Sequence, residues 1–206
     1  MNSITGALTD SSGDRQKELL AYFQNLEQNP EGYKLAINEL TNNRSNLNDS
    51  AVFFYFKIIE CHIKTRFELD SEENRFLVKQ YVCNYFVAKK YDYQSFLLNK
   101  YASIVNSLFQ VEYPLRKWPT FFSDFLAQCN DKHSCSLFLR ILDQINVEIG
   151  EREHILTVKE MEKSGLIKDL MRESDVNRIV QFWFSLIVSC GLDLCVLVLV
   201  SSGSTS

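Results

Sequence analysis

Apolar residues recur at helical spacing through residues 96–149, where three stripes follow one another along the chain. Steps of three and four between apolar positions are typical of amphipathic helices that bury one face. The pattern therefore predicts three consecutive helices, the middle one beginning at a corner formed by Trp118 and Pro119. The stripes are Leu97, Tyr101, Ile104 and Leu108; Trp118, Phe121, Phe122, Phe125, Leu126 and Cys129; and Phe138, Ile141, Leu142, Ile145 and Ile149.

The same spacing extends over most of the chain, and expected helical pairs begin near residues 14, 49, 94 and 134. An interval of about 35–45 residues is that of HEAT-type repeats. Each helix leaves a hydrophobic face that one partner does not cover, and stacking of successive pairs covers it. We therefore expect an all-α fold, a right-handed α-solenoid of HEAT-like helical hairpins. A compact helical bundle is the alternative.

Local signals mark where several of these helices should start. Side chains that accept hydrogen bonds from backbone N–H groups favour the N-cap position, and proline suits the first helical turn. The expected starts are Asn29 with Pro30, a position near Asn48, Asp70 with Glu73, Thr157 with Glu160, and Ser174.

Composition narrows the function classes. Hydrophobic residues make up 46% of the 206 residues, too many for a disordered chain, and 7 Gly with 3 Pro argue against a loop-rich β fold. The formal net charge of −4 disfavours a general nucleic-acid coat, which needs clustered Lys and Arg. The first 18 residues contain no apolar core of a secretory signal, so the 6 Cys are expected as buried thiols in a reducing compartment.

No constellation of residues predicts catalysis. Cys129, His133 and Cys135 are close in sequence, but no second Cys/His pair lies at zinc-finger spacing. His62 and His154 lack a nearby nucleophile with a partner acid, and no Gly-rich loop could cradle a phosphate. We expect a protein that is not an enzyme, with neither a metal site nor a cofactor.

Basic residues form three loose groups. Each alone fits a solvated helix face, but along the inner face of a solenoid they could meet phosphate or an acidic partner. The groups are Lys57, Lys64 and Arg66; Arg116 and Lys117; and Lys168 and Arg172.

The segment FLLNKYASIVNSLFQVEYPLRKWPTFFSDFL, residues 96–126, resembles the amino-terminal signature of exportins in the importin-β (karyopherin) family. In those exportins an Arg-Asn-Lys start precedes an apolar helix, an acidic-aromatic turn and a Trp-bearing helix. Collinear blocks at residues 14–40, 53–71, 137–154 and 165–173 resemble the opening repeats of the exportins that carry tRNA. One departure is Leu98, which stands where the family pattern has Arg before Asn99 and Lys100.

This resemblance implies a HEAT-repeat fold whose first repeats bind the GTPase Ran in its GTP form. It implies a nuclear export receptor for tRNA that shuttles between nucleus and cytoplasm, contacts nuclear pore proteins and works as a monomer without cofactor. Two expected contact sets follow: Ran binding by Lys79, Asn99, Lys100, Arg116 and Lys117, and tRNA binding by Lys57, Lys64, Arg66, Lys168 and Arg172.

The carboxyl-terminal residues interrupt the pattern. We expect a polar segment at 1–12, a HEAT-repeat exportin domain at 13–188, and an atypical apolar and Ser-rich tail at 189–206 that indicates a truncated or alternative end. Residues 182–200 carry a single charge, Asp193, so a tail-anchored helical protein is one alternative. A helical-repeat adaptor that binds proteins but neither Ran nor tRNA is the other.

Overall fold

A computed structural model describes residues 13–88, 94–151 and 157–201, and the side chains of residues 17–88, 94–150 and 157–188. The chain divides into two compact units, residues 1–155 and residues 156–206, which are described separately. Every described regular element is helical, which confirms the predicted all-α, HEAT-like class.

The first unit contains seven α-helices within its described residues. Two short 3₁₀ turns, η1 (Arg44–Asn46) and η2 (Phe67–Leu69), lie between them, and a π-helical segment, η3 (Asn146–Glu151), follows the last. The α-helices are α2 (Gly13–Gln28), α3 (Gly32–Asn42), α4 (Asp49–Thr65), α5 (Glu72–Val87), α6 (Ser95–Glu112), α7 (Phe121–Leu126) and α8 (Lys132–Ile145).

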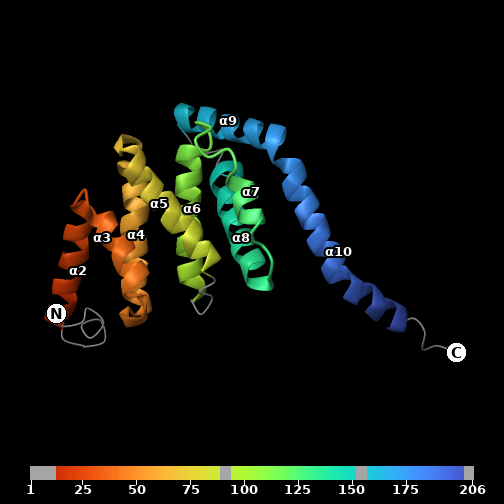
Figure 1. Cartoon of the computed structure of the whole chain (residues 1–206), viewed down its shortest axis with the longest axis horizontal. Helices are drawn as coiled ribbons and strands as arrows, with labels where there is room; N and C mark the ends of the chain where they lie inside the picture. Colours follow the sequence, from red (N-terminus) through yellow and green to blue (C-terminus); the bar gives the residue numbers. More distant parts are fainter. Residues whose placement is uncertain (1–12, 89–93, 152–156, 202–206) are drawn as a thin grey trace. The chain divides into compact units, whose positions relative to one another are not determined.

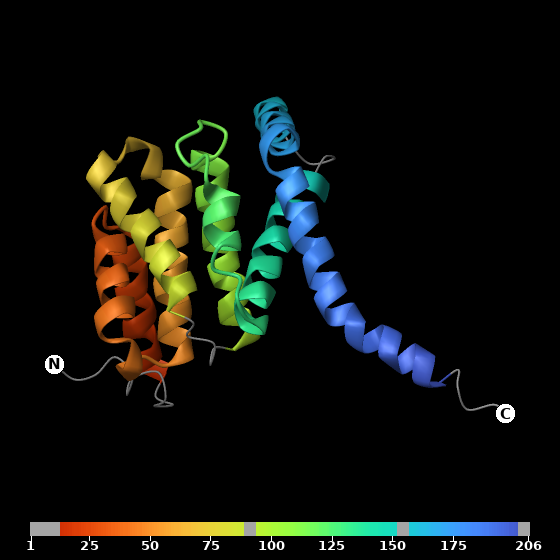
Figure 2. The same ribbon diagram turned by 45° about the vertical axis from the view of Figure 1, so that its right-hand side comes forward.

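These helices form two rows (Figures 1 and 2). In one row α2 packs on α4, α4 on α6, and α6 on α8. The helices between them in sequence form the second row: α3 packs on α2 and α4, while aromatic rings join α5 to α4 and α6, and α7 to α5 and α6. The predicted pair starts near residues 14, 49, 94 and 134 correspond to the starts of α2, α4, α6 and α8.

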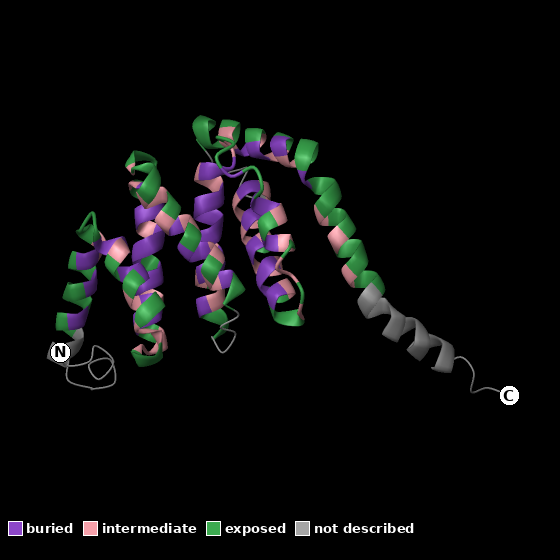
Figure 3. Cartoon of the chain, viewed as in Figure 1, coloured by how far each residue is buried: buried purple, intermediate pink, exposed green. Residues whose placement is uncertain are grey.

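The core of this unit lies between the two rows, where α4 and α6 are buried over much of their length (Figure 3). The first and third predicted stripes are buried except for Leu142, and the aromatic rings of the second are buried as well. Tyr101 illustrates how the rows are joined: its ring stacks on Tyr85, with centroids 4.3 Å apart, and its hydroxyl donates to the Val82 carbonyl at 2.7 Å.

The middle helix of the predicted three differs from expectation. It is the short α7, and Trp118 lies in the turn before it, where the indole Nε1 donates to Asp124 Oδ2 at 2.8 Å. Cys129 lies beyond α7 and is half-buried rather than on a helical stripe. The next helix begins soon afterwards, where Asp131 caps α8 and accepts hydrogen bonds from the N–H groups of His133 and Ser134.

The predicted helix starts were partly right. Asn48 caps α4 and Thr157 forms a capping box with Glu160, as expected. Ser71, not Asp70, caps α5, because its hydroxyl reaches the Asn74 N–H. Two further expectations were wrong: α3 follows Glu31 rather than Asn29, whose side chain accepts from the Glu31 N–H, and Ser174 is the last residue of α9 rather than a cap.

The second unit consists of α9 (Val158–Ser174) and α10 (Val176–Ser201), which pack on each other. Helix α10 continues through residue 188 without a break, and the predicted division at 189 stays a prediction. None of the helices in the described part of the chain is long and apolar enough to cross a membrane.

Candidate functional site

The residues predicted to bind Ran fall on both rows of the first unit. Lys79 lies on α5, whereas Asn99 and Lys100 lie on α6. Arg116 and Lys117 are exposed in the turn after α6. The structure brings Lys79 and Lys117 together, because both line one surface hollow beside Glu112.

Lys79 is held there by an ion pair that links α5 to the end of α6. Its Nζ lies 2.6 Å from Glu112 Oε2. The Glu112 side chain is 1% exposed and that of Lys79 is 25% exposed, so the pair is largely removed from water. A buried carboxylate needs such a partner, because its desolvation would otherwise be costly.

The turn after α6 presents the two remaining cations. The Lys117 N–H bonds the Glu112 carbonyl and the Arg116 N–H bonds the Tyr113 carbonyl, which is the hydrogen-bond pattern of a Schellman motif. Arg116 takes the left-handed position of that motif with φ 55°, a place usually occupied by glycine. Within the described part of the chain, neither side chain forms an ion pair, so both charges are available to a partner.

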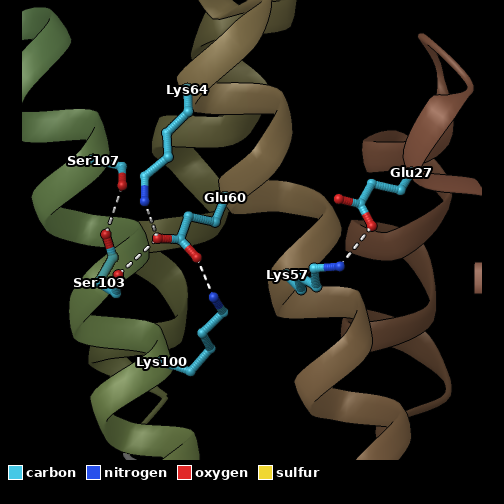
Figure 4. A network of polar contacts seen from close by, with 7 residues as sticks. All are labelled: Glu27, Lys57, Glu60, Lys64, Lys100, Ser103 and Ser107. Atoms are coloured by element: carbon cyan, nitrogen blue, oxygen red, sulfur yellow. Dashed lines mark hydrogen bonds and ion pairs between the residues drawn. The ribbon is translucent and has the colours of Figure 1, made fainter. Parts of the chain in front are cut away.

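Lys100 and Lys64, predicted for different partners, converge instead on one carboxylate (Figure 4). Glu60 Oε1 accepts from Lys64 Nζ at 2.6 Å and from the Ser103 hydroxyl at 2.7 Å, while Oε2 accepts from Lys100. Burial raises the pKa of Glu60, but the hydrogen bonds from Lys100, Lys64 and Ser103 outweigh it, and the net pKa lies below its usual value. The network fastens α4 to α6.

The other predicted tRNA contacts are also engaged within the protein. Lys57 pairs with Glu27 at 2.9 Å, which joins α4 to α2 (Figure 4), and Arg66 Nη2 donates to the Gln28 carbonyl at 3.1 Å. In the second unit, Arg172 pairs with Asp169 one turn earlier on α9, at 2.8 Å. Lys57, Lys64 and Arg172 keep substantial exposure and can still meet an anion from solvent.

Asn99 is exposed, and its side chain also joins two helices. Its Oδ1 accepts a hydrogen bond from Arg140 Nη1, which connects α6 to α8. A shallow hollow beside this contact is lined in part by Asp143 and Gln144. Asn99 is therefore placed in the row of α4, α6 and α8, away from Lys79 on α5.

The acidic partners Glu60 and Glu112 were not singled out by sequence reasoning, and neither was Arg140. The Glu60–Lys64 pair could have been found from its i,i+4 spacing. The Glu60–Lys100 and Lys79–Glu112 pairs join positions far apart in sequence, which periodicity alone does not pair. Within the described residues, no group of three or more His, Cys, Asp or Glu could hold a metal ion.

The hollow between α5 and the end of α6 thus carries mixed charge, with Arg75, Lys79 and Lys117 beside Glu72, Glu73 and Glu112. Comparison with known proteins gives the family. The family described as exportin 1-like protein matches residues 94–200, more than half of the chain. The chain belongs to the exportin 1-like family.

Curated relatives agree with this assignment. The exportin chain is 29% identical to "Exportin-T" of Homo sapiens over 189 residues, which is 90% of this chain and 19% of the relative. It is 30% identical to "Exportin-T" of Dictyostelium discoideum over 180 residues, 86% of this chain and 16% of the relative. It is 28% identical to "Exportin-T" of Danio rerio over 189 residues, which is 90% of this chain and 20% of the relative. The chain therefore spans about a fifth of the length of the curated relatives that it matches.

Proposed function

We propose that this chain is the Ran-GTP-binding amino-terminal part of a nuclear export receptor for tRNA. The observation that carries the proposal is the similarity to proteins named Exportin-T over about 90% of the chain. The receptor would shuttle between nucleus and cytoplasm as a monomer, meeting nuclear pore proteins on the way. A stack of helical hairpins suits such a role, because it offers a long surface to a macromolecular partner.

The Ran contact is proposed at the turn after α6 and the adjoining hollow. Arg116 and Lys117 are exposed there, and Lys79 lies at the same hollow. Exposed cations that are not used in helix packing can change partner without destabilising the fold. Lys100 and Asn99 are proposed as supports of the neighbouring row, because Glu60 and Arg140 already bind them.

The tRNA contacts are proposed at cations that keep their heads partly in water. Lys64 is 58% exposed although it bonds Glu60, and Lys57 and Arg172 are also substantially exposed. A phosphate would have to compete with their carboxylate partners, which reduces the gain from each contact. Lys168 and Arg66 complete the proposed set.

The proposal is tested by calorimetric titration of residues 1–206 with Ran loaded with GTP or with GDP. The variant Arg116→Asp/Lys117→Glu reverses both exposed charges, and Asp tolerates the left-handed position. We expect binding of the GTP form only, weakened about tenfold or more in the variant. Lys132→Glu, an exposed reversal at the first residue of α8, is the matched control and should bind like the parent.

Unaltered helicity of each variant by circular dichroism is required for the comparison. Equal affinity of the double variant and the control would remove the turn from the Ran site. Absence of binding by the parent chain to either form of Ran would favour the helical-repeat adaptor, the alternative class of function.

A further inference from the structure

A hollow of about 580 Å³ lies where α5 begins and α6 ends. Its lining comes from the first turns of α5, the end of α6 and the turn that follows. Three carboxylates, three cations and one aromatic ring line it: Glu72, Glu73 and Glu112; Arg75, Lys79 and Lys117; and Phe76. All belong to the first unit.

Glu112 makes this hollow unusual, because only one of its two carboxylate oxygens is paired. Oε2 bonds Lys79, but Oε1 is buried and has no hydrogen-bond partner among the described residues. A buried carboxylate oxygen without a donor is costly, and natural proteins rarely leave one in that state. Glu112 Oε1 is therefore an acceptor for which the described residues provide no hydrogen-bond donor.

The rim of the hollow indicates which donor would fit. Glu72 and Glu73 are exposed carboxylates on the first turn of α5, and the Phe76 ring, 62% exposed, follows one turn later. A guanidinium group presents five N–H donors in a plane, so it can reach two carboxylates while its face lies on an aromatic ring. An ammonium is a compact charge that does not bridge in this way.

We propose that this hollow binds an arginine side chain presented by a protein partner, with Glu112 Oε1 as its deepest acceptor. An anion would leave Oε1 unpaired and would face the carboxylates of Glu72 and Glu73. Lys79 is neutralised by Glu112 Oε2 and so opposes the incoming cation less than an unpaired lysine would. Arg75 and Lys117 also line the hollow, and their charges oppose an incoming cation.

The inference can be tested without Ran, so that its failure and the failure of the proposed function remain distinguishable. Residues 1–206, labelled with ¹⁵N, are titrated with N-acetyl-arginine amide and, separately, with N-acetyl-citrulline amide, which has a similar shape but no charge. Amide chemical shifts report where each compound binds. We expect saturable changes confined to the amides near residues 72–79 and 112–117 for the arginine compound, and binding about tenfold weaker for citrulline.

Variants locate the acceptor. Glu112→Gln should weaken arginine binding about tenfold, and Phe76→Ala should weaken it severalfold. Lys117→Ala should strengthen it, because a competing cation is removed. The double variant Glu72→Gln/Glu73→Gln changes only the exposed rim and gives the same test if Glu112→Gln fails to fold. Glu162→Gln, which changes an exposed carboxylate on α9, is the matched control.

Saturable shifts that disappear in the Glu112 or rim variants support the site. Shifts spread over the surface, equal binding of arginine and citrulline, or undiminished binding by the Glu112 and rim variants would each overturn it.

Discussion

At the scale of single residues, charges in this chain are shared rather than isolated. Glu60 receives two ammonium groups and a hydroxyl, so one buried carboxylate organises donors from both α4 and α6 (Figure 4). Two cations on one anion leave a net positive charge at that surface. Residues selected as partner contacts therefore also stabilise the stack, and variants that reverse Lys64 or Lys100 would confuse binding with folding.

The Glu60 network predicts a dependence of stability on pH. The pKa of Glu60 is lowered below its usual value of 4.5, so its contribution is present above that pH and is lost as the pH falls through the folded-state pKa. Glu60→Gln should lower the free energy of unfolding by about 1.5–3 kcal/mol at pH 7. Its deficit against the parent should shrink as the pH falls below 4.5.

Urea unfolding followed by circular dichroism, at pH 7 and at a series of pH values below 4.5, checks this expectation. Glu68→Gln, an exposed carboxylate in η2, serves as the control for charge alone. A deficit that stays constant with pH would mean that Glu60 stabilises the protein by packing and not through its ionised form.

Arg116 separates backbone strain from side-chain function. A left-handed conformation costs a non-glycine residue roughly 1–2 kcal/mol, so Arg116→Gly should raise the stability of the first unit by about 1 kcal/mol. The same change removes a charge from the proposed Ran surface and should weaken Ran-GTP binding. Thermal unfolding and calorimetric titration measure the two effects, and a variant that gained stability with full affinity would exclude the Arg116 side chain from the contact.

At the scale of elements, the sequence predicted the rows better than the turns. The stripes Leu97 to Leu108 and Phe138 to Ile149 correspond to α6, to α8 and to the segment after it, because a buried face imposes a period that can be read directly. The predicted helix at Trp118 was only partly right, since the ring is buried from a turn. Its indole bond to Asp124 depends on the path of that turn, which periodicity does not specify.

Capping gave a similar mixture of outcomes. Thr157 was found from its spacing to Glu160, but Asp131 forms an equivalent box with Ser134 that the Glu-or-Gln pattern does not include. The side chain of Ser174 suits an N-cap, but Ser174 is the last residue of α9 and so does not cap a following helix. A cap is decided by where the preceding helix ends as well as by the residue itself.

The Asp131 box predicts a measurable contribution to the end of the first unit. Asp131→Ala removes the acceptor of two backbone N–H groups at the start of α8 and should cost about 0.5–2 kcal/mol of unfolding free energy. Asp131→Asn keeps an acceptor and should cost less. Urea denaturation of both variants checks the order, and equal losses would indicate that the charge, not the hydrogen bond, stabilises α8.

At the scale of the whole molecule, the fold class was predictable and the charge pairing was not. Helix spacing and the family resemblance both indicated stacked hairpins. The pairs that join neighbouring helices, such as Lys79 with Glu112, depend on which faces meet in three dimensions. For this reason the five residues predicted as one Ran surface lie on α5, on α6 and in the turn after α6. The five cations predicted for tRNA are divided between the two units.

This division predicts how residues 1–206 behave towards tRNA. Most of the proposed tRNA cations already bond carboxylates or a carbonyl, and the chain carries a net charge of −4, so few phosphates can be neutralised. A receptor that holds its cargo at several places along a long surface gains from multivalency, and a segment about a fifth as long as its relatives would lose that gain. We expect weak tRNA binding whose affinity falls with salt and is not increased by Ran-GTP.

Filter-binding titrations at near-physiological and at low salt, each with and without Ran-GTP, measure these quantities. Tight, Ran-stimulated binding by residues 1–206 would show that this segment alone holds the cargo, and the exposed heads of Lys57 and Arg172 would then be the first positions to test by charge reversal.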